Sequence, residues 1–473
     1  MREGNGAWFR AAGYGLFIHF GLYAIPAGEW NGVPAPHESE WIMRHLQIPL
    51  ADYRKLAEEF CPTELNARAI VQKAREWGMK YLVLTAKHHD GFALFDSAVS
   101  DYTVMHTPYG KDIVRQFADE CHRVGMPFGI YYSQMQDWEH PDGDGNSWDF
   151  DVAEKDFFRY FYGKCLPQVR ELVTRYGKVD LLWFDTPYTM PEELCRELVD
   201  TVKTYQPQCL INSRIGYGLG DYRQMADNSI PTHPYTAQSW ECPMTLNRTW
   251  GYSRLDQDWK TPEDVLALLT TVRSLGGNVL LNIGPDASGS VPAESVRVLD
   301  AAGKAIALQS AAFYGTTAAP EFPYVQRWGT ITYREEPPTL YFHVRKYPKP
   351  PYRFSTVGLV TRVESARLLA TGENLKFTQW REVARDEERL SVYLPATPVA
   401  DGDTVVELRP PRYRRWNDPH LRGRFAGGKK KGLCKSPFLF SGDGACGVSP
   451  PVFWQNIPAD GRRRGRTRAA PFP

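Results

Sequence analysis

The clearest indication of the fold is the segment Tyr81-Leu82-Val83-Leu84-Thr85-Ala86-Lys87-His88-His89-Asp90-Gly91-Phe92. Its first six residues are almost all apolar, which predicts a β-strand buried on both faces, as in a parallel sheet. Imidazoles and charged groups follow directly, and such groups are expected there only if they face something polar. Because the strands of a parallel α/β barrel end at its active site, this stretch predicts a barrel enzyme with a polar ligand.

The same order of helix, glycine and apolar strand recurs along the first part of the chain. Helices are expected at 67–77, 112–124, 157–176, 192–205 and 262–274. Strands are expected at 14–20, 81–86, 128–133, 179–185, 209–214 and 278–283, and 237–241 is a candidate seventh. Repeated units of this kind, with glycine capping the helices, form a parallel α/β fold, so we predict a (β/α) TIM-like barrel. The competing doubly wound sheet carries a Gly-x-Gly-x-x-Gly turn after its first strand, and this sequence lacks it.

After about residue 320 the pattern changes to short β-rich segments separated by turn residues. They stand at 339–344, 366–369, 390–394 and 404–408. This pattern predicts a C-terminal antiparallel β-sandwich domain. We therefore expect a catalytic barrel over residues 1–318, a β-sandwich over 319–410 and a basic, disordered tail over 411–473. An anion- or nucleic-acid-binding role and a reading-frame artefact are the alternatives for the tail.

Charge and aromatic content narrow the class of partner. The net charge is +1, but residues 411–473 hold 14 Lys and Arg against 3 Asp, so residues 1–410 carry about −10. An acidic body argues against nucleic acid as the main partner. The 14 Trp and the aromatic share of 13% suit sugar binding, because aromatic faces stack on the C–H faces of sugars. A large aromatic core is the alternative explanation.

Cysteine spacing and the N-terminal sequence indicate the cellular compartment in which the protein is expected. The eight Cys form no Cys-x-x-Cys pair and fit no zinc framework, so we expect buried thiols and a reducing compartment. The first residues have no charged-then-apolar secretory pattern, and the apolar run 14–20 is too short to cross a bilayer. We therefore expect a cytoplasmic protein that is not bound to a membrane. It would be secreted or periplasmic if a leader had been removed.

Polar residues stand at the predicted carboxyl ends of the strands. They are His19, His88, His89, Tyr131, Tyr132, Asp185, Arg214, Glu241 and Asn282. Asp185 follows an apolar run, where a carboxylate is costly unless it has a partner or a task. It could instead cap a turn, and His19 could be a hydrogen-bonded core histidine. Two carboxylates on either side of a glycosidic bond would explain the set, one attacking the sugar and the other, for which Glu241 is the candidate, acting as the acid.

Two other chemistries are weaker on sequence grounds. His19, His88, His89 and Asp185 could bind zinc in a barrel hydrolase, but there is no His-x-His on the first strand and no His-Glu-x-x-His helix. A Ser–His–Asp hydrolase is disfavoured because no Gly-x-Ser-x-Gly elbow occurs. We therefore expect no metal site.

These segments together resemble the α-L-fucosidases of glycoside hydrolase family 29. The matching segments are 15–21, Glu40-Trp41, 87–92, Trp183-Phe184-Asp185, 240–247, 250–252 and 278–285. The resemblance implies a retaining exo-α-L-fucosidase that hydrolyses terminal α-L-fucosyl linkages through a covalent fucosyl-enzyme, without a metal or organic cofactor. A non-catalytic fucose-binding protein and a metal-dependent barrel hydrolase stay open as alternatives.

The resemblance also assigns roles to residues. It makes Asp185 the nucleophile and Glu241, in the Trp-Glu motif, the general acid/base, with Glu40 as the alternative acid. The residues expected to hold the fucose are His19, Glu40, Trp41, His88, His89, Tyr131, Trp183, Arg214 and Trp250. Tyr132 could replace Tyr131. The expected partner is a fucosylated oligosaccharide or glycoconjugate, and the loops after Asp185 and over 216–236 are expected to set the linkage. The oligomeric state is left open, a homo-oligomer included.

Overall fold

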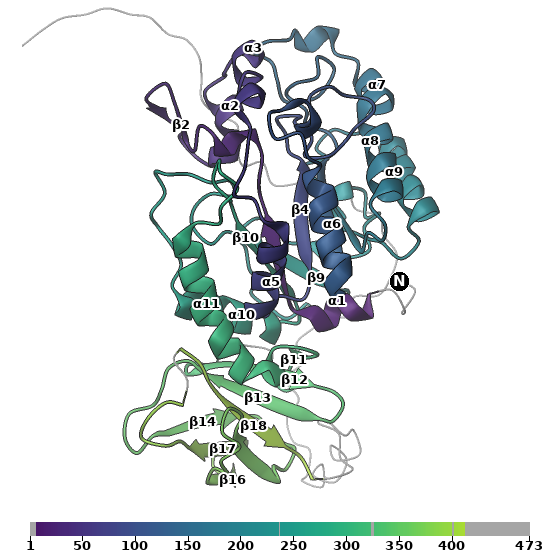
Figure 1. The fold of residues 1–473 in the computed structure, drawn as a ribbon. Coiled ribbons are helices and arrows are strands. Elements are labelled where there is room, and N and C mark those ends of the chain that lie inside the picture. The colour runs from purple at the N-terminus through teal and green to yellow at the C-terminus, as the bar shows by residue number, and fades with distance from the viewer. Residues whose placement is uncertain (1–5, 236, 323–325, 400–401, 412–473) are drawn as a thin grey trace, which may run out of the picture. The chain divides into compact units, whose positions relative to one another are not determined.

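The computed structural model describes residues 6–235, 237–322, 326–399 and 402–411. A parallel barrel is followed in the chain by antiparallel sheets (Figure 1). The predicted tail falls outside the described residues from position 412 onward.

The parallel sheet has eight strands among the described residues. They are β1 (Tyr14–Ile18), β4 (Leu82–Lys87), β5 (Phe128–Ser133), β6 (Leu181–Asp185), β7 (Leu210–Ile211), β8 (Arg223–Gln224), β9 (Trp240–Met244) and β10 (Asn278–Ile283). Consecutive strands of this set pair in parallel from β1 to β7 and from β8 to β10, and β10 pairs with β1. A parallel bridge between Asn212 and Tyr222 connects the end of β7 to the start of β8. The eight strands therefore close into the predicted (β/α) barrel.

Helices alternate with these strands and cover the outside of the barrel (Figure 1). The longer ones are α5 (Ala67–Glu76), α6 (Ile113–Val124), α8 (Leu166–Arg175), α9 (Glu192–Tyr205), α10 (Pro262–Ser274) and α11 (Ala293–Leu308). The short ones are α1 (Ala7–Ala12), α2 (Ile42–His45), α3 (Leu50–Tyr53), α4 (Leu56–Glu59) and α7 (Phe157–Tyr160). Local sequence sets their ends: the Asp112 side chain caps α6 by accepting from Arg115 N, and Gly125 ends it in the left-handed conformation.

Aromatic side chains close the amino end of the barrel. Phe9 of helix α1 packs against Tyr81 and Tyr222, with ring centroids 5.5 Å and 4.6 Å away. These two tyrosines immediately precede β4 and β8, and both are buried. The barrel is therefore filled at this end, which leaves the carboxyl ends of the strands as the open side.

Two strand predictions need correction. β8 was not predicted, because two residues give no hydrophobic period to recognise. The candidate strand at 237–241 was also misplaced: β9 begins at Trp240 and continues through Pro243, a residue that sequence patterns place outside central strands. Glu241 pairs with Asn278, the first residue of β10. It therefore lies near the amino end of its strand, and its expected position at the carboxyl end was wrong.

The C-terminal β domain has two antiparallel sheets, as predicted. One contains β11 (Thr317–Ala318), β12 (Gly329–Arg334), β13 (Thr339–Val344), β18 (Thr404–Arg409) and β15 (Ser365–Leu368). The other contains β14 (Arg353–Val357), β17 (Glu387–Tyr393) and β16 (Phe377–Glu382). Phe342, Phe354 and Val392 belong to one buried cluster that joins the two sheets. The boundary expected at residue 318 stays a prediction.

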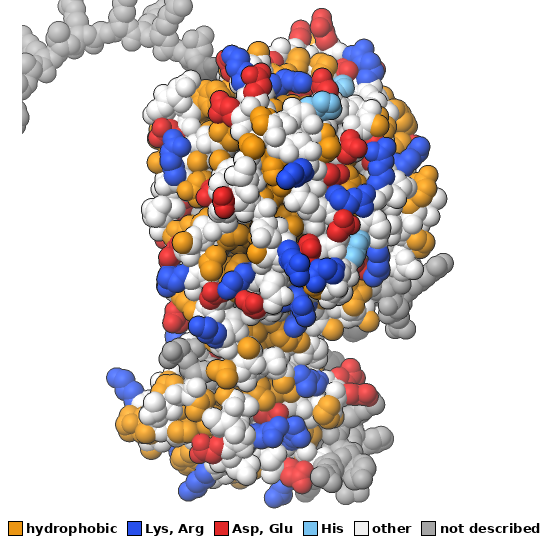
Figure 2. Space-filling model, in the orientation of Figure 1, with side chains coloured by type: hydrophobic (Ala, Val, Ile, Leu, Met, Phe, Trp, Pro, Cys, Tyr) orange, Lys and Arg blue, Asp and Glu red, His pale blue; other side chains and the backbone are white. Residues whose placement is uncertain are grey.

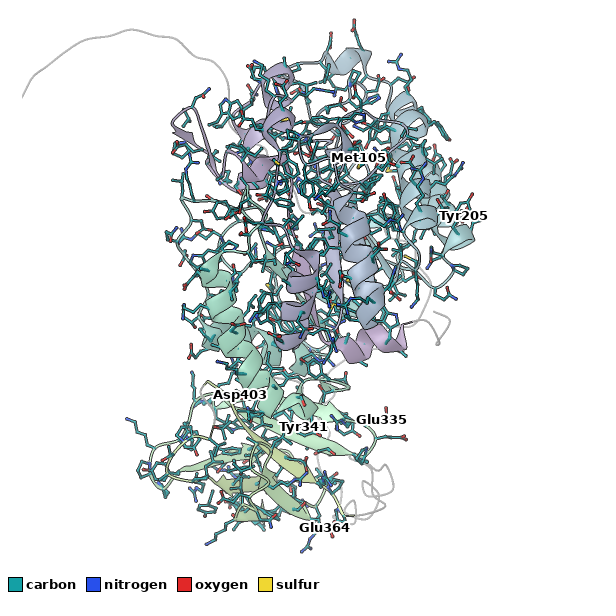
Figure 3. The ribbon with its side chains drawn as sticks, in the orientation of Figure 1. Met105, Tyr205, Glu335, Tyr341, Glu364 and Asp403 are labelled. Carbon is teal, nitrogen blue, oxygen red and sulfur yellow. The ribbon has the colours of Figure 1, made fainter. Side chains whose placement is uncertain are left out.

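Successive residues of β13 face different cores. Phe342 belongs to the core of the β domain, whereas its neighbour Tyr341 belongs to the core of the barrel. Beyond helix α11, the Gln309 amide donates to Asp403 O and accepts from Val405 N, both at 2.8 Å. Figure 3 shows Asp403 and Tyr341 near that end of α11. The five-stranded sheet therefore contributes residues both to the barrel core and to its own.

Acidic and basic side chains are interspersed over the face shown in Figure 2. Among the described residues, no helix combines the length and apolarity needed to cross a membrane.

Candidate active site

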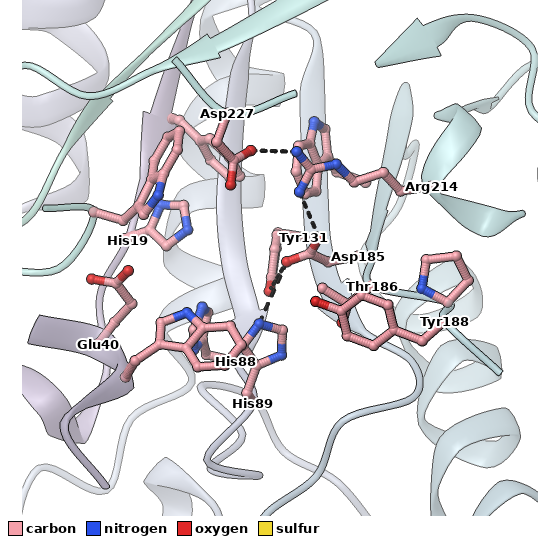
Figure 4. Close-up of a pocket in the computed structure, with 15 residues that line it drawn as sticks. His19, Glu40, His88, His89, Tyr131, Asp185, Thr186, Tyr188, Arg214 and Asp227 are labelled. Carbon is pink, nitrogen blue, oxygen red and sulfur yellow. Dashed lines mark hydrogen bonds and ion pairs between the residues drawn. The ribbon is translucent and has the colours of Figure 1, made fainter. Parts of the chain in front are cut away.

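A cavity of about 340 Å³ lies at the carboxyl ends of the barrel strands (Figure 4). It is lined by Phe17, His19, Glu40, Trp41, His88, His89, Tyr131, Trp183, Asp185, Thr186, Pro187, Tyr188, Arg214, Asp227 and Trp250. The structure thus brings together Asp185 and all the residues predicted to hold the sugar. The size is at the small end of the range for ligand pockets, which suits a single sugar ring.

Asp185 is held in place on both carboxylate oxygens. Arg214 donates to Oδ1 at 2.7 Å, and the Tyr131 hydroxyl donates to Oδ2 at 2.9 Å. His89 Nε2 lies 3.5 Å from Oδ2. Burial alone would raise the pKa of Asp185, but the Arg214 charge and the hydrogen bonds from Arg214 and Tyr131 bring it below its ordinary value. The carboxylate is therefore ionised and pre-aligned, as a nucleophile must be.

Arg214 also contacts a second carboxylate, Asp227, through Nη2. Figure 4 shows its guanidinium between the two carboxylates. The side chain of Asp227 is 49% exposed, against 10% for that of Asp185, so Asp227 lies at the mouth and Asp185 further inside. Partial burial raises the pKa of Asp227, and Asp185 adds to this while Arg214 opposes it. The two carboxylates thus have pKa values shifted in opposite directions.

Asp227 is not among the site residues predicted from the sequence. It follows β8, whose two residues produce no strand pattern to mark a strand end. The only available signal was its place in the 216–236 loop, which was expected to affect substrate choice.

His19 presents an acceptor nitrogen to the cavity. Its Nδ1 lies 2.7 Å from Asn282 Oδ1, and Asn282 Nδ2 donates to Trp250 O at 2.6 Å, which fixes the orientation of the amide. Nδ1 must therefore carry the proton, and Nε2 keeps its lone pair. Burial lowers the pKa of His19 to about 3, so the ring is neutral and can accept from a hydroxyl.

His89 is oriented in the same way by a serine. Its Nδ1 lies 2.7 Å from Ser133 Oγ, whose only hydrogen is donated to Gln136 O, also at 2.7 Å. Nδ1 is therefore the donor, and Nε2 faces the cavity unprotonated. Burial lowers the pKa of His89 to about 4. Two neutral imidazoles can thus accept hydrogen bonds from the hydroxyl groups of a ligand.

Glu40 adds a third polar acceptor. Its Oε2 accepts from Gly251 N at 2.8 Å and Thr249 Oγ1 at 3.1 Å, whereas the buried Oε1 has no partner among the described residues. Burial raises the pKa of Glu40 to about 7. Since Glu40 lines the cavity, Oε1 is available for a ligand hydroxyl.

Aromatic rings form the apolar part of the cavity. Tyr131 stacks on Trp183 with ring centroids 5.4 Å apart, and Phe17 packs against Trp183 at 5.2 Å. Trp250 lies 5.2 Å from the ring of His19. These faces can contact the C–H groups of a sugar, while the imidazoles and carboxylates bind its hydroxyls.

Neighbours of the predicted residues point away from the cavity. Tyr132, the alternative to Tyr131, donates to Gln168 at 2.8 Å, because successive strand residues face opposite sides. Lys87 Nζ pairs with the buried carboxylate of Asp137 at 2.8 Å. Asp90 accepts from the Tyr53 hydroxyl at 3.2 Å. Of residues 81–92, only His88 and His89 line the cavity.

Glu241 is separated from the cavity by Trp183. The indole Nε1 donates to Glu241 Oε1 at 3.1 Å, and the Tyr81 hydroxyl bonds to Oε2. Glu241 is fully buried and is absent from the cavity wall that the described residues form. Burial raises its pKa to about 7. Both oxygens already have partners inside the barrel, which suits a structural role for Glu241.

Replacing Glu241 with glutamine is expected to change how stability depends on pH. The carboxyl titrates at about 7 when folded and near its ordinary value of 4.5 when unfolded. Between these values the folded chain keeps a proton that the unfolded chain releases, so wild-type stability falls as pH rises, by up to about 3 kcal/mol. Glutamine does not titrate, so the stability of Glu241→Gln relative to wild type should increase as the pH rises. Unfolding at about pH 5, 6 and 8 measures the difference, and a pH-independent difference would contradict this.

Among the described residues, no group of three or more His, Cys, Asp or Glu is arranged to hold a metal ion.

Several known proteins that this chain resembles are α-L-fucosidases. The chain is 30% identical over 310 residues to the plasma α-L-fucosidase of Rattus norvegicus, an alignment that covers 60% of the chain and about two thirds (65%) of that relative. Its structure resembles an α-L-fucosidase from Vibrio sp. (TM-score 0.81, 32% identity, 87% of this chain and 73% of that one). It also resembles a Lactobacillus casei α-L-fucosidase solved with its α-L-fucose product (TM-score 0.61, 41% identity, 63% and 97%).

The α-L-fucosidase family model matches residues 2–310, which include the whole barrel and every residue of the cavity wall. The chain therefore belongs to the α-L-fucosidase family and is a glycoside hydrolase.

Proposed function

We propose that this chain hydrolyses terminal α-L-fucosyl linkages of oligosaccharides or glycoconjugates with retention, using Asp185 as nucleophile and Asp227 as general acid/base. The observation that carries the proposal is the ionised Asp185 carboxylate, held by Arg214 and Tyr131 in the wall of a cavity for one sugar. Retention through a fucosyl-enzyme is the mechanism that membership of this family implies.

The first step forms the covalent intermediate. An Asp185 oxygen attacks C1 of the fucosyl group, the bond from C1 to the glycosidic oxygen breaks, and Asp227 gives its proton to that oxygen. In the second step ionised Asp227 takes a proton from water, whose oxygen attacks C1 and releases Asp185. The raised pKa of Asp227 and the lowered pKa of Asp185 suit these roles.

Position favours Asp227 as the acid over the two glutamates. The fucosyl ring would fill the cavity, so the glycosidic oxygen would lie near the mouth, where Asp227 is half exposed. Glu241 lies behind Trp183 with both oxygens bonded. Glu40 is fully buried, and one of its oxygens is bonded to Gly251 and Thr249. A hydroxyl-binding role fits Glu40 better.

The donors and acceptors of the cavity favour a hydroxyl-rich ring. His19 and His89 offer neutral Nε2 atoms, and Glu40 offers an unpartnered Oε1, so sugar hydroxyls would donate to all three. The aromatic faces of Trp183 and Trp250 would contact its apolar side, including a methyl group in place of a polar hydroxymethyl. The fucose complex of the Lactobacillus casei relative supports fucose as the sugar.

The test is hydrolysis of an aryl α-L-fucoside followed by proton NMR. We expect α-L-fucose to be released first and the β-anomer to appear only by mutarotation. Initial release of the β-anomer would contradict the retaining mechanism. Binding without turnover would favour a fucose-binding protein, and activity lost on chelation and restored by zinc would favour a metal-dependent hydrolase.

A further inference from the structure

Tyr188 is an exposed aromatic residue at the mouth of the cavity. Its side chain lines the cavity, yet the residue is 67% exposed. Figure 4 shows it beside Thr186 and Asp185, on the side opposite His19 and Glu40. Among the described residues its hydroxyl has no hydrogen-bond partner. A large aromatic residue left exposed beside a binding cavity is available for a ligand that extends out of it.

The loop that carries Tyr188 is held in an unusual backbone conformation. Thr186 and Tyr188 have φ angles of +44° and +25°, which residues other than glycine seldom adopt. Such residues persist only where the surroundings hold them, and they concentrate at ligand sites. Here Gln136 Nε2 donates to Thr186 Oγ1 at 3.0 Å, and Met190 N donates to Pro187 O at 2.7 Å. The position of Tyr188 is therefore built into the loop.

Gln136 also connects this loop to Arg44, on another part of the cavity mouth. Arg44 Nη1 donates to Gln136 Oε1 at 2.9 Å, and the Arg44 guanidinium lies 5.5 Å from the ring centre of Trp41. Trp41 lines the cavity and is partly exposed. One side-chain amide thus links Arg44, beside Trp41, to the loop of Tyr188. A rim linked in this way can contact a leaving group without moving.

We propose that Tyr188 forms the wall of a subsite for the leaving group, where its ring face stacks on the sugar or aryl ring attached to the fucosyl oxygen. This inference rests on the proposed function. A cavity that holds one ring must let the remainder of the substrate leave through its mouth, where Tyr188 stands. Contacts with a remote part of the substrate lower the barrier only for substrates that possess that part.

The experiment compares substrates with and without a ring in the leaving group. α-L-Fucosyl fluoride has none, whereas the fucosyl disaccharide best cleaved by wild type, from an α1,2, α1,3, α1,4 and α1,6 panel, has one. Tyr188→Ala should lower kcat/KM for the disaccharide about tenfold or more and leave that for the fluoride within about twofold. Tyr188→Phe keeps the ring and should resemble wild type. Tyr162→Ala removes a similarly exposed tyrosine (50%) outside the cavity wall and is the matched control.

Different results would contradict the subsite and the proposed function. An unchanged disaccharide rate in Tyr188→Ala would overturn the subsite. An equal loss on both substrates would overturn it too, because Tyr188 would then shape the fucose site, and weaker inhibition by fucose would confirm that reading. Absence of wild-type turnover on the fluoride and on every disaccharide would defeat the proposed function itself.

Discussion

Asp185→Ala should lower kcat for an aryl α-L-fucoside by about 10⁴-fold or more, because no covalent intermediate can form. Fucose binding should persist, since His19, His89 and Glu40 keep their own anchors in Asn282, Ser133 and Thr249. Steady-state kinetics measures the first effect, and calorimetry with fucose measures the second.

Azide distinguishes a lost nucleophile from a damaged site. In the alanine variant azide can occupy the space left by the carboxylate and attack C1 from the same side, which should restore turnover and produce β-L-fucosyl azide. Wild-type turnover in this variant would remove Asp185 from the nucleophile role. The α-anomer of the azide would show that the enzyme still forms a covalent intermediate at another residue.

Asp227→Ala should make the rate depend strongly on the leaving group. A phenol of low pKa departs without a proton, so the first step with a dinitrophenyl fucoside should stay close to wild type. A sugar leaving group needs the proton, and kcat/KM should fall by about 10²–10⁴-fold. Azide should here trap the intact fucosyl-enzyme as the α-anomer. Because Asp185→Ala and Asp227→Ala each remove one partner of Arg214, they form a matched pair that differs in the anomer produced.

Glutamine variants of the other two carboxylates test the alternative assignments. Glu241→Gln keeps groups that can bond with Tyr81 and Trp183, and it should show wild-type dependence on the leaving group. Glu40→Gln should raise KM for all substrates alike, as loss of a hydroxyl contact would. If either variant, in place of Asp227→Ala, lost activity selectively on poor leaving groups, that residue would be the acid.

Sequence patterns predicted most of the barrel because its strands are long and apolar. The strand at 128–133 and the helices at 192–205 and 262–274 match the structure at both ends. Prediction failed where this signal is short or interrupted. β8 has two residues, and the proline within β9 hides the continuation of that strand. Because that continuation was not predicted, Glu241 was placed at the carboxyl end of its strand. This position made it the preferred candidate for the general acid.

The barrel, the β domain and most of the groups around Asp185 were predictable from sequence patterns alone. The continuous apolar runs that predict buried strands and the 3.6-residue repeat that predicts helices are local properties of the sequence. A polar residue that directly follows a buried strand must lie at the carboxyl edge of the sheet. The carboxylate that shares Arg214 with Asp185 could be identified only from the three-dimensional arrangement. Asp227 comes from a loop without a local pattern, and its place depends on the Arg214 guanidinium that contacts both carboxylates. Loop positions follow from long-range packing, which adjacent residues in the chain do not encode.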